Sequence, residues 1–291
     1  MELDSIPMWV VFAATIIIVM VANEVGYRLG RVSHRHSDDE KESPVSAIAG
    51  SILGLTAFML AFTFGIVTDR YDARKALVRD EANAIGTAYL RSDFLPEPDR
   101  SEAANLFRQY VDDRLAAAQS RDLDQTHRVL MASDRIQHQL WNMAVVNARK
   151  DMNSDVAALY IDSLNAVIDL HATRVAVGLH ARVPAGLWLV LGILVILGCT
   201  GVGYQTAIAG SRRSRAMPIM AFAFAIVIVL ITSLDRPGSG FITVSQQPIE
   251  DLRASMAAGS EGRSNRGEKP LQSGADQEDD QRPRPDKAKS E

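Results

Sequence analysis

The sequence predicts an all-α, polytopic membrane protein: four transmembrane helices arranged as two hairpins, a helical-bundle middle region and a disordered C-terminal tail. Four stretches contain no Asp, Glu, Lys or Arg, the region between the second and third has helical apolar periodicity, and the last residues are nearly free of bulky apolar side chains. The predicted segments are a first transmembrane hairpin at 1–68, a soluble helical bundle at 69–182, a second hairpin at 183–235, a post-membrane strand and helix at 236–258, and the tail at 259–291.

The charge-free stretches are long enough to cross a bilayer. They run over 6–22, 45–68, 183–210 and 216–234, which is 17, 24, 28 and 19 residues. Roughly 20 apolar residues in a helix span a hydrocarbon core about 30 Å thick. The first stretch is the shortest, but its nine Ile, Val and Phe residues favour insertion by about 3 to 5 kcal/mol. A cleaved signal peptide is not expected, because two acidic residues and no Lys or Arg precede this stretch.

The middle region is expected to be an antiparallel bundle of helices with short connections. The helix of the second span should continue into water and end near Leu95, because Pro96 disfavours a helical conformation in the residue before it. Asp99 and Glu102 form a capping-box pattern that starts the next helix. The predicted buried stripes are Phe107, Tyr110, Val111 and Leu115; then Val129, Leu130, Ile136, Leu140, Trp141 and Ala144 on a helix at 123–150; then Val156, Leu159, Tyr160, Leu164, Val167 and His171 on a helix from about 154.

The connecting segments are predicted from their polarity and β-propensity. Residues 28–42 should form a polar loop between the first two spans, and residues 211–215 a basic turn between the last two. After the fourth span, the β-branched run 241–244 predicts a short strand. Ser245, followed by Pro248, marks the start of a last helix that reaches about 258.

Composition argues against several classes of protein. The net charge is −4, and the middle region has 15 basic and 17 acidic residues, so nucleic-acid binding is not expected. No catalytic motif, cofactor motif or metal-ligand set is present, so we predict neither an enzyme nor a cofactor. Glu81, Asn83 and Asp235 are the only acid, base or nucleophile candidates near the membrane edge, and we interpret them as caps and interhelical hydrogen-bond partners. Cys199 lies in the third span, where an apolar packing role is expected.

The second span carries the most informative pattern. Phe58 and Phe62 stand one turn apart, as in a hydrophobic constriction that gates by dewetting, although packing or lipid contact would also explain two phenylalanines. On an adjacent face, small residues recur at steps of three and four. Such a stripe lets another helix approach closely, either within the chain or in an oligomer. The members of this small-residue stripe are Gly50, Gly54, Ala57, Ala61 and Gly65.

The run from Phe58 to Arg74 resembles the second-span signature of the bestrophin channels. Its continuation from Asp80 to Leu90, with the Asp235-Arg236-Pro237 segment and the run from Val244 to Pro248, is similar to the bacterial bestrophin-like domain family of uncharacterised membrane proteins. This resemblance covers about residues 5–258. Beyond the phenylalanines, the residues that carry it are Arg70, Tyr71, Asp72, Arg74, Glu81, Asn83, Gly86, Asp235, Arg236 and Pro237.

The resemblance implies a pore neck formed by the second spans, with Phe58 and Phe62 at neck positions. Gly54 departs from the pattern, because bestrophins usually carry a bulky apolar residue there, and a neck of three rings is therefore not implied. The acidic cluster with which eukaryotic bestrophins clasp calcium after the fourth span has no counterpart in this sequence. Activation by calcium is not predicted.

Two functional hypotheses follow. The first is a homo-oligomeric ion channel in the cell (inner) membrane, with inorganic ions passing a hydrophobic gate and lipid surrounding the spans. The second is a non-conducting membrane scaffold or sensor that binds a partner through its helical bundle, since the spans contain no charge to coordinate ions. Lys and Arg in the two short connections favour cytoplasmic hairpin turns. Bestrophins have the reverse orientation, with the helical region in the cytoplasm.

Overall fold

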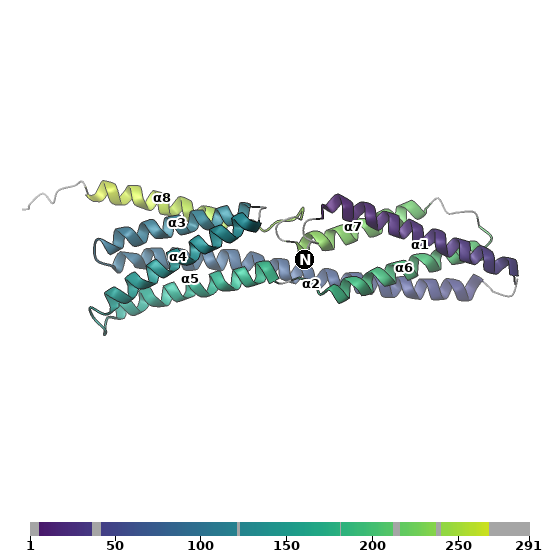
Figure 1. The fold of residues 1–291 in the computed structure, drawn as a ribbon, viewed down its shortest axis with the longest axis horizontal. Coiled ribbons are helices and arrows are strands. Elements are labelled where there is room, and N and C mark those ends of the chain that lie inside the picture. Colours follow the sequence, from purple (N-terminus) through teal and green to yellow (C-terminus); the bar gives the residue numbers. More distant parts are fainter. Residues whose placement is uncertain are drawn as a thin grey trace, which may run out of the picture.

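The computed structural model describes residues 6–36, 42–120, 123–180, 182–211, 216–236 and 240–267. These residues are almost entirely helical (Figure 1). In chain order the elements are α1 (Met8–His36), α2 (Glu42–Arg91), the 3₁₀ turn η2 (Ser92–Phe94), α3 (Asp99–Gln119), α4 (Leu123–Ala148), α5 (Asp155–His180), α6 (Ala185–Ile208), α7 (Met217–Asp235) and α8 (Gln247–Gly267).

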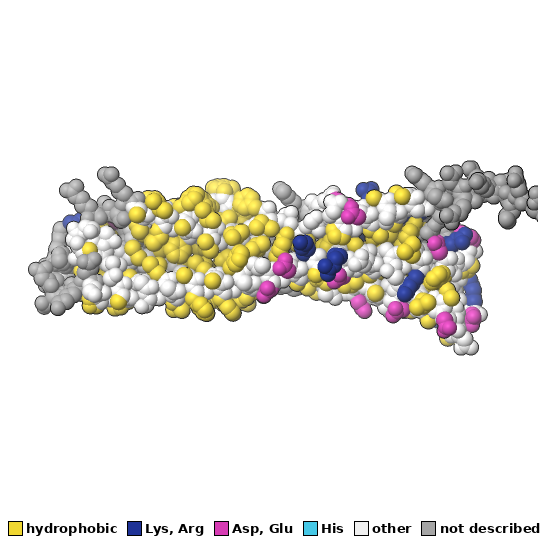
Figure 2. Space-filling model, turned by 180° about the vertical axis from the view of Figure 1, so that it is seen from behind, with side chains coloured by type: hydrophobic (Ala, Val, Ile, Leu, Met, Phe, Trp, Pro, Cys, Tyr) yellow, Lys and Arg dark blue, Asp and Glu magenta, His cyan; other side chains and the backbone are white. Residues whose placement is uncertain are grey.

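The molecule is elongated and consists of two halves in line. One half contains α1, α6, α7 and the first part of α2, and the other contains α3, α4, α5, α8 and the rest of α2 (Figure 1). Hydrophobic side chains cover the first half and charged side chains cluster on the second (Figure 2). Within the described residues, four helices are long and apolar enough to cross a membrane. The predicted all-α, multi-pass membrane architecture is confirmed.

The α2 helix joins the two halves without a break. Its 50 residues extend about 75 Å, well beyond the thickness of a bilayer. Its proline, Pro44, lies in the first turn, where a missing N–H is tolerated, and no charged residue occurs between Pro44 and Asp69. The helix ends at Arg91, η2 follows, and Leu95 is extended with ψ 146° ahead of the proline. The predicted continuation of the second-span helix beyond the charge-free stretch and its end near Leu95 are confirmed.

The two transmembrane hairpins interleave. Both α6 and α7 pack against α1 and against α2, whereas among the described residues α1 makes no packing contact with α2, nor α6 with α7. Glycines permit the closest crossing, between α1 and α6. A Cβ atom on Gly26 would lie 2.0 Å from the carbonyl oxygen of Thr200, and one on Gly203 would lie 2.1 Å from that of Asn23. The two helices of each hairpin, α1 with α2 and α6 with α7, are therefore diagonal in the four-helix arrangement.

The bundle half has its own hydrophobic core. The stripe predicted for α3 is buried in full, and on α4 the residues Ile136, Leu140 and Ala144 are buried. On α5 the stripe is buried only from Tyr160 onward. The prediction was wrong for Val156 and Leu159, which are 45% and 46% exposed, because they lie on a flank of α5 that no other described helix covers.

Several predicted boundaries were wrong. Residues 28–36, expected in a loop, are the last turns of α1, in which the pair Glu24–Arg28 stabilises the helix at 2.8 Å. The capping box at the start of α3 does not form. Instead Glu97 accepts a hydrogen bond from the Ser101 amide, and Asp99 accepts one from Asn147 at 2.6 Å.

The segment after the fourth span also differs from expectation. Residues 241–244 are not a strand, because they have no neighbouring strand to pair with in the described part of the chain. Helix α8 continues to Gly267, past the predicted end at 258, so the first residues of the predicted disordered tail are helical. Residues 268–291, Pro237 and most of the basic turn at 211–215 lie outside the described residues.

Candidate functional site: the outward face of α2 and its charged anchor

The outward face of α2 carries the predicted small-residue stripe. Every member of the stripe is exposed. A Cβ atom added to Gly50, Gly54 or Gly65 would meet no atom within 4 Å. Packing among the described helices therefore does not explain the stripe. Within the described membrane spans, glycines such as Gly26 and Gly203 do serve intrachain packing, and they lie on α1 and α6.

Phe58 and Phe62 lie on the same uncovered side of the helix. Their exposed fractions are 66% and 54%, although α2 buries Leu60 and Val67 on its opposite side against α6 and α7. A rotation of 100° per residue places the stripe on one flank and the phenylalanines about 80° around the helix from it. Neither phenylalanine packs against the core of its own chain.

Acidic side chains continue this line beyond the membrane. Asp69 and Asp72 are exposed and lie within about 40° of Phe58 on the helix surface. Asn83, further along, is exposed as well. The outward face therefore changes from small and aromatic residues in the charge-free span to charged residues just outside it, with Asp69 and Asp72 first and the exposed Lys75 and Arg79 after them.

Arginines gather around the carboxyl end of α7. Arg74 donates to the Leu234 carbonyl at 2.9 Å, and Arg182 donates to the Asp235 carbonyl at 3.1 Å. The Asp235 carboxylate accepts the Val183 amide at 3.0 Å and lies 3.8 Å from Arg70. Cations at a helix C-terminus are stabilised by the helix dipole. These side chains join α2, α7 and the segment before α6 at the end of the charge-free spans. Arg236 lies in the same region and donates to the Ile6 carbonyl at 2.7 Å, and Tyr71 of α2 is partly buried there.

A buried ion cluster anchors α2 in the bundle. Glu81 is fully buried and contacts Arg114 at 2.9 Å and Arg174 through a second, short ion pair. Burial by itself would raise the pKa of the Glu81 carboxyl, but the two guanidinium groups outweigh it and hold the pKa below its ordinary value. Arg174 also donates to Gln246 at 2.5 Å, just before α8. The cluster thus connects α2, α3, α5 and the start of α8.

A polar chain continues from this cluster. Gln137 donates to the Tyr110 hydroxyl at 3.1 Å, and that hydroxyl lies 3.0 Å from His171 Nδ1. His171 Nε2 lies 3.4 Å from Asp134, so the network assigns the Nε2–H tautomer, with Tyr110 donating to Nδ1. Burial, followed by the nearby Arg114, lowers the pKa of His171. His171 is buried, as its place on the stripe predicted, and both ring nitrogens have polar partners.

The enzyme candidates do not converge. Glu81 is enclosed by two arginines, Asn83 points outward from the bundle, and Asp235 lies at the end of α7. Among the described residues, no group of three or more His, Cys, Asp and Glu side chains is placed to hold a metal ion. Gly86 has a packing role instead, because a Cβ atom there would lie 3.2 Å from Leu252 of α8.

Sequence reasoning missed the partners of these residues. Arg114 follows the buried Tyr110 by four positions and Arg174 follows His171 by three, so both fall on predicted buried stripes. Charged residues at such positions signal a buried ion pair. The α1–α6 crossing had a signal too, because Gly26 and Gly30 have the spacing of close helix packing.

Comparison with known proteins agrees with this architecture. A family model described as Bestrophin-like domain matches residues 14–249. A bacterial bestrophin homologue from Klebsiella pneumoniae, solved by Zn-SAD phasing, has a TM-score of 0.59 at 14% identity, covering 89% of this chain and 98% of that chain. A point variant of a Klebsiella pneumoniae homologue gives a TM-score of 0.58 at 15% identity, covering 84% and 98%.

These structures share the fold at low identity, and no curated protein matches the chain by sequence. The family model covers most of the chain, from the first span to the start of α8. The chain therefore belongs to the bestrophin-like domain family and is a multi-pass membrane protein.

Proposed function

We propose that the protein is a homo-oligomeric ion channel of the cell inner membrane in which the outward faces of α2 surround the pore. The observation that carries this proposal is the uncovered face itself. Phe58 is 66% exposed, and none of the helices that the structure describes covers the small-residue stripe beside it. An uncovered glycine stripe offers another α2 helix a close approach, which ordinary lipid-facing positions do not require.

The angular arrangement of the face supports a ring of α2 helices. If the α2 helix of a neighbouring copy packs against the small-residue flank, Phe58 and Phe62 are turned about 80° away from that contact. In a closed ring, this direction is toward the axis. Two rings of phenylalanine would then form a hydrophobic constriction that excludes water when narrow. Gly54 leaves the next turn wide, so the constriction has two rings.

The acidic positions support a preference for inorganic cations. Both are exposed, and on the helix surface Asp69 lies about 20° and Asp72 about 40° from Phe58. In a ring these carboxylates would surround the pore entrance on the bundle side. Rings of Asp and Glu are a common device of cation channels.

Planar-bilayer recording of the purified full chain tests the proposal. We expect a cation conductance that Phe58→Ala or Phe62→Ala increases, because removing an aromatic ring widens and wets the constriction. Phe222→Ala is the matched control. Phe222 lies on α7 with 52% exposure, close to the 54% of Phe62, and its replacement should leave conductance unchanged.

Two results would contradict the channel. One is a silent bilayer containing monodisperse oligomer, which would favour the scaffold or sensor alternative. The other is a conductance that neither substitution alters. Asp69→Asn with Asp72→Asn tests the ion sign separately, because a reversal potential unchanged in a KCl gradient would remove these acids from selectivity.

A further inference from the structure

Large apolar side chains are exposed at the end of the bundle that lies away from the four membrane-spanning helices. Leu90 in the last turn of α2 is 64% exposed, and Phe94 in η2 is 52% exposed. Val156 and Leu159 are exposed near the start of α5. The Arg91 side chain donates to the Leu159 carbonyl at 2.7 Å and so brings the end of α2 and the start of α5 together. We call these four apolar side chains the distal patch.

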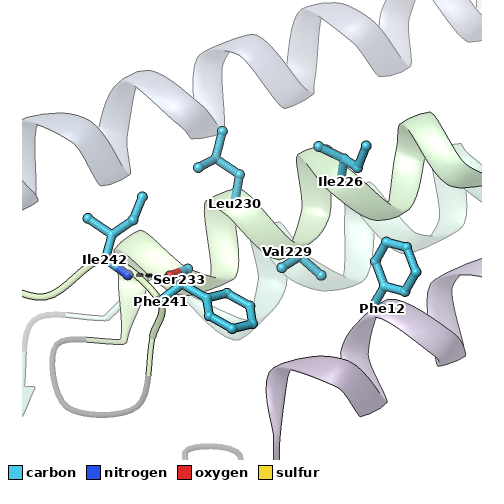
Figure 3. Close-up of a pocket in the computed structure, with 7 residues that line it drawn as sticks. All are labelled: Phe12, Ile226, Val229, Leu230, Ser233, Phe241 and Ile242. Carbon is cyan, nitrogen blue, oxygen red and sulfur yellow. Dashed lines mark hydrogen bonds between the residues drawn. The ribbon is translucent and has the colours of Figure 1, made fainter.

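The distal patch lies outside the hydrocarbon core of a membrane. Leu90 is about 32 Å along α2 beyond Asp69, the first charged residue after the second span. A different apolar surface, the groove between Phe12 of α1 and Leu230 of α7, lies on the membrane-spanning helices, where lipid chains can fill it (Figure 3). The distal patch meets water instead. A group of large apolar side chains exposed to water is typical of a contact with another protein.

The uncovered face of α2 leads from the second span to the distal patch. Beyond Phe62, exposed positions recur every three or four residues along the rest of the helix, which is the period of one helix side. These positions are Gly65, Asp69, Asp72, Lys75, Arg79, Asn83, Thr87 and Leu90. The distal patch is therefore continuous with the face around which the proposed function arranges the copies. This continuity favours a second copy of the chain as the partner.

The distal patch has two parts on opposite sides of this face. Gly86, one turn before Leu90, lies next to α8, because a Cβ atom there would be 3.2 Å from an α8 side chain, so Leu90 lies toward the α8 side. Arg91, about 100° further around the helix, reaches α5 instead. Val156 and Leu159 therefore lie on the α5 side. Two different surfaces of one chain that fit each other give a head-to-tail contact, and such contacts can close into a ring.

We propose that Leu90 of one copy packs against Val156 and Leu159 of the next copy, so that the distal patches join the bundles of neighbouring copies. Leu90 lies about 40° from Phe58, toward the flank of α2 that carries the small-residue stripe. A neighbour that approaches the stripe in the membrane therefore approaches Leu90 from the same side. The contact rests on the proposed function, because it extends an assembly formed along α2. It removes from water the apolar side chains that a single chain leaves exposed.

Crosslinking between differently tagged chains tests the pairing. Two full-length chains, both with Cys199→Ala, are co-expressed, one carrying Leu90→Cys and the other Leu159→Cys, and native membranes are treated with a short bismaleimide. We expect a covalent dimer that carries both tags. A Met131→Cys chain in place of the Leu159→Cys chain should give no such dimer, because Met131, although 60% exposed, lies on α4 away from the patch.

Assembly in detergent measures the strength of the contact. Leu90→Gln should raise the dissociation constant of the oligomer, followed by mass photometry on dilution, by at least about tenfold, the effect of losing the burial of one leucine. Met131→Gln is the control and should leave the dissociation constant unchanged.

The outcomes separate this contact from the channel. An oligomeric wild type in which the Leu90→Cys chain forms no two-tag dimer, or becomes linked to a different protein, would overturn the contact and leave the α2 assembly standing. A monomeric wild type would overturn both proposals. A two-tag dimer together with a silent bilayer would support the contact and overturn the channel alone.

Discussion

The buried carboxylate of Glu81 offers a quantitative test of how α2 is held in the bundle. The side chain is 0% exposed, and its partners Arg114 and Arg174 have side chains 5% and 14% exposed. Glu81→Gln keeps the size of the side chain and removes its charge. Two guanidinium groups would then remain buried without a carboxylate between them.

The expected loss of stability is large for one substitution. Removing one partner from a buried ion pair costs about 3 to 5 kcal/mol, because the remaining charge stays desolvated. In a domain of this size the loss should lower the apparent melting temperature by about 10 °C. The Glu97→Gln variant is the control. Glu97 is an exposed glutamate that also contacts an arginine, Arg100, at 2.6 Å, and exposed pairs contribute little.

Thermal unfolding in detergent, followed by intrinsic fluorescence, measures the difference. Acid should reduce it, since the folded pKa of Glu81 lies below its ordinary value of 4.5. The contribution of Glu81 is complete above that value and is lost as the pH falls through the lower folded pKa. The reasoning is refuted if Glu81→Gln and Glu97→Gln have the same melting temperature at neutral pH. It is also refuted if the double variant Glu81→Gln with Arg114→Gln is no more stable than Glu81→Gln alone.

Three further predictions concern other parts of the chain. Gly26→Val should destabilise the α1–α6 crossing by about 3 kcal/mol and abolish the monodisperse peak in gel filtration, whereas Gly192→Val, in open space, should retain it. His171 has a folded pKa below 6.5, so the stability it confers is complete above that value and falls at lower pH as the unfolded chain takes up a proton. The melting temperature of His171→Gln should therefore depend less on pH between about pH 7 and 5.5 than that of the wild type. If the hairpin turns are cytoplasmic, the cysteine of Ser211→Cys, made in a Cys199→Ala background, should not be labelled by a membrane-impermeant maleimide in whole cells but should be labelled in inverted vesicles. The opposite labelling pattern would show the reverse orientation.

The transmembrane helices and most of the bundle could be predicted because their signals are local. A span needs apolar side chains on all sides, and composition alone reveals such a stretch. The α3 stripe ending at Leu115 could be read from its period, because one side of the helix faces a core and the other faces water. The same all-round apolar composition hides which side of a span is buried. The outward position of Phe58 therefore could not be read from the span itself.

The features that escaped prediction depend on partners distant in the chain. The close backbone approach of Gly26 to Thr200 could be predicted only if it were known that α6 lies between α1 and α2. Burial of Arg174 becomes stable only once Glu81 faces it across the bundle. End effects have a similar origin, since Asp99 accepts a hydrogen bond from Asn147 of α4 instead of forming the expected capping box, and Glu97 accepts the Ser101 amide. Local pattern is informative about elements and much less so about contacts between them.

The unbroken length of α2 has a mechanical consequence. From Glu81 to the midpoint between Phe58 and Phe62 is about 32 Å along a single helix. If a rigid helix of that length tilts by about 5° at Glu81, the aromatic rings move by about 3 Å. If the helix instead rotates about its own axis, the rings turn through the angle of that rotation. A change in the tilt of α2 at Glu81 therefore moves Phe58 and Phe62 directly, because one continuous helix without a hinge joins the two sites.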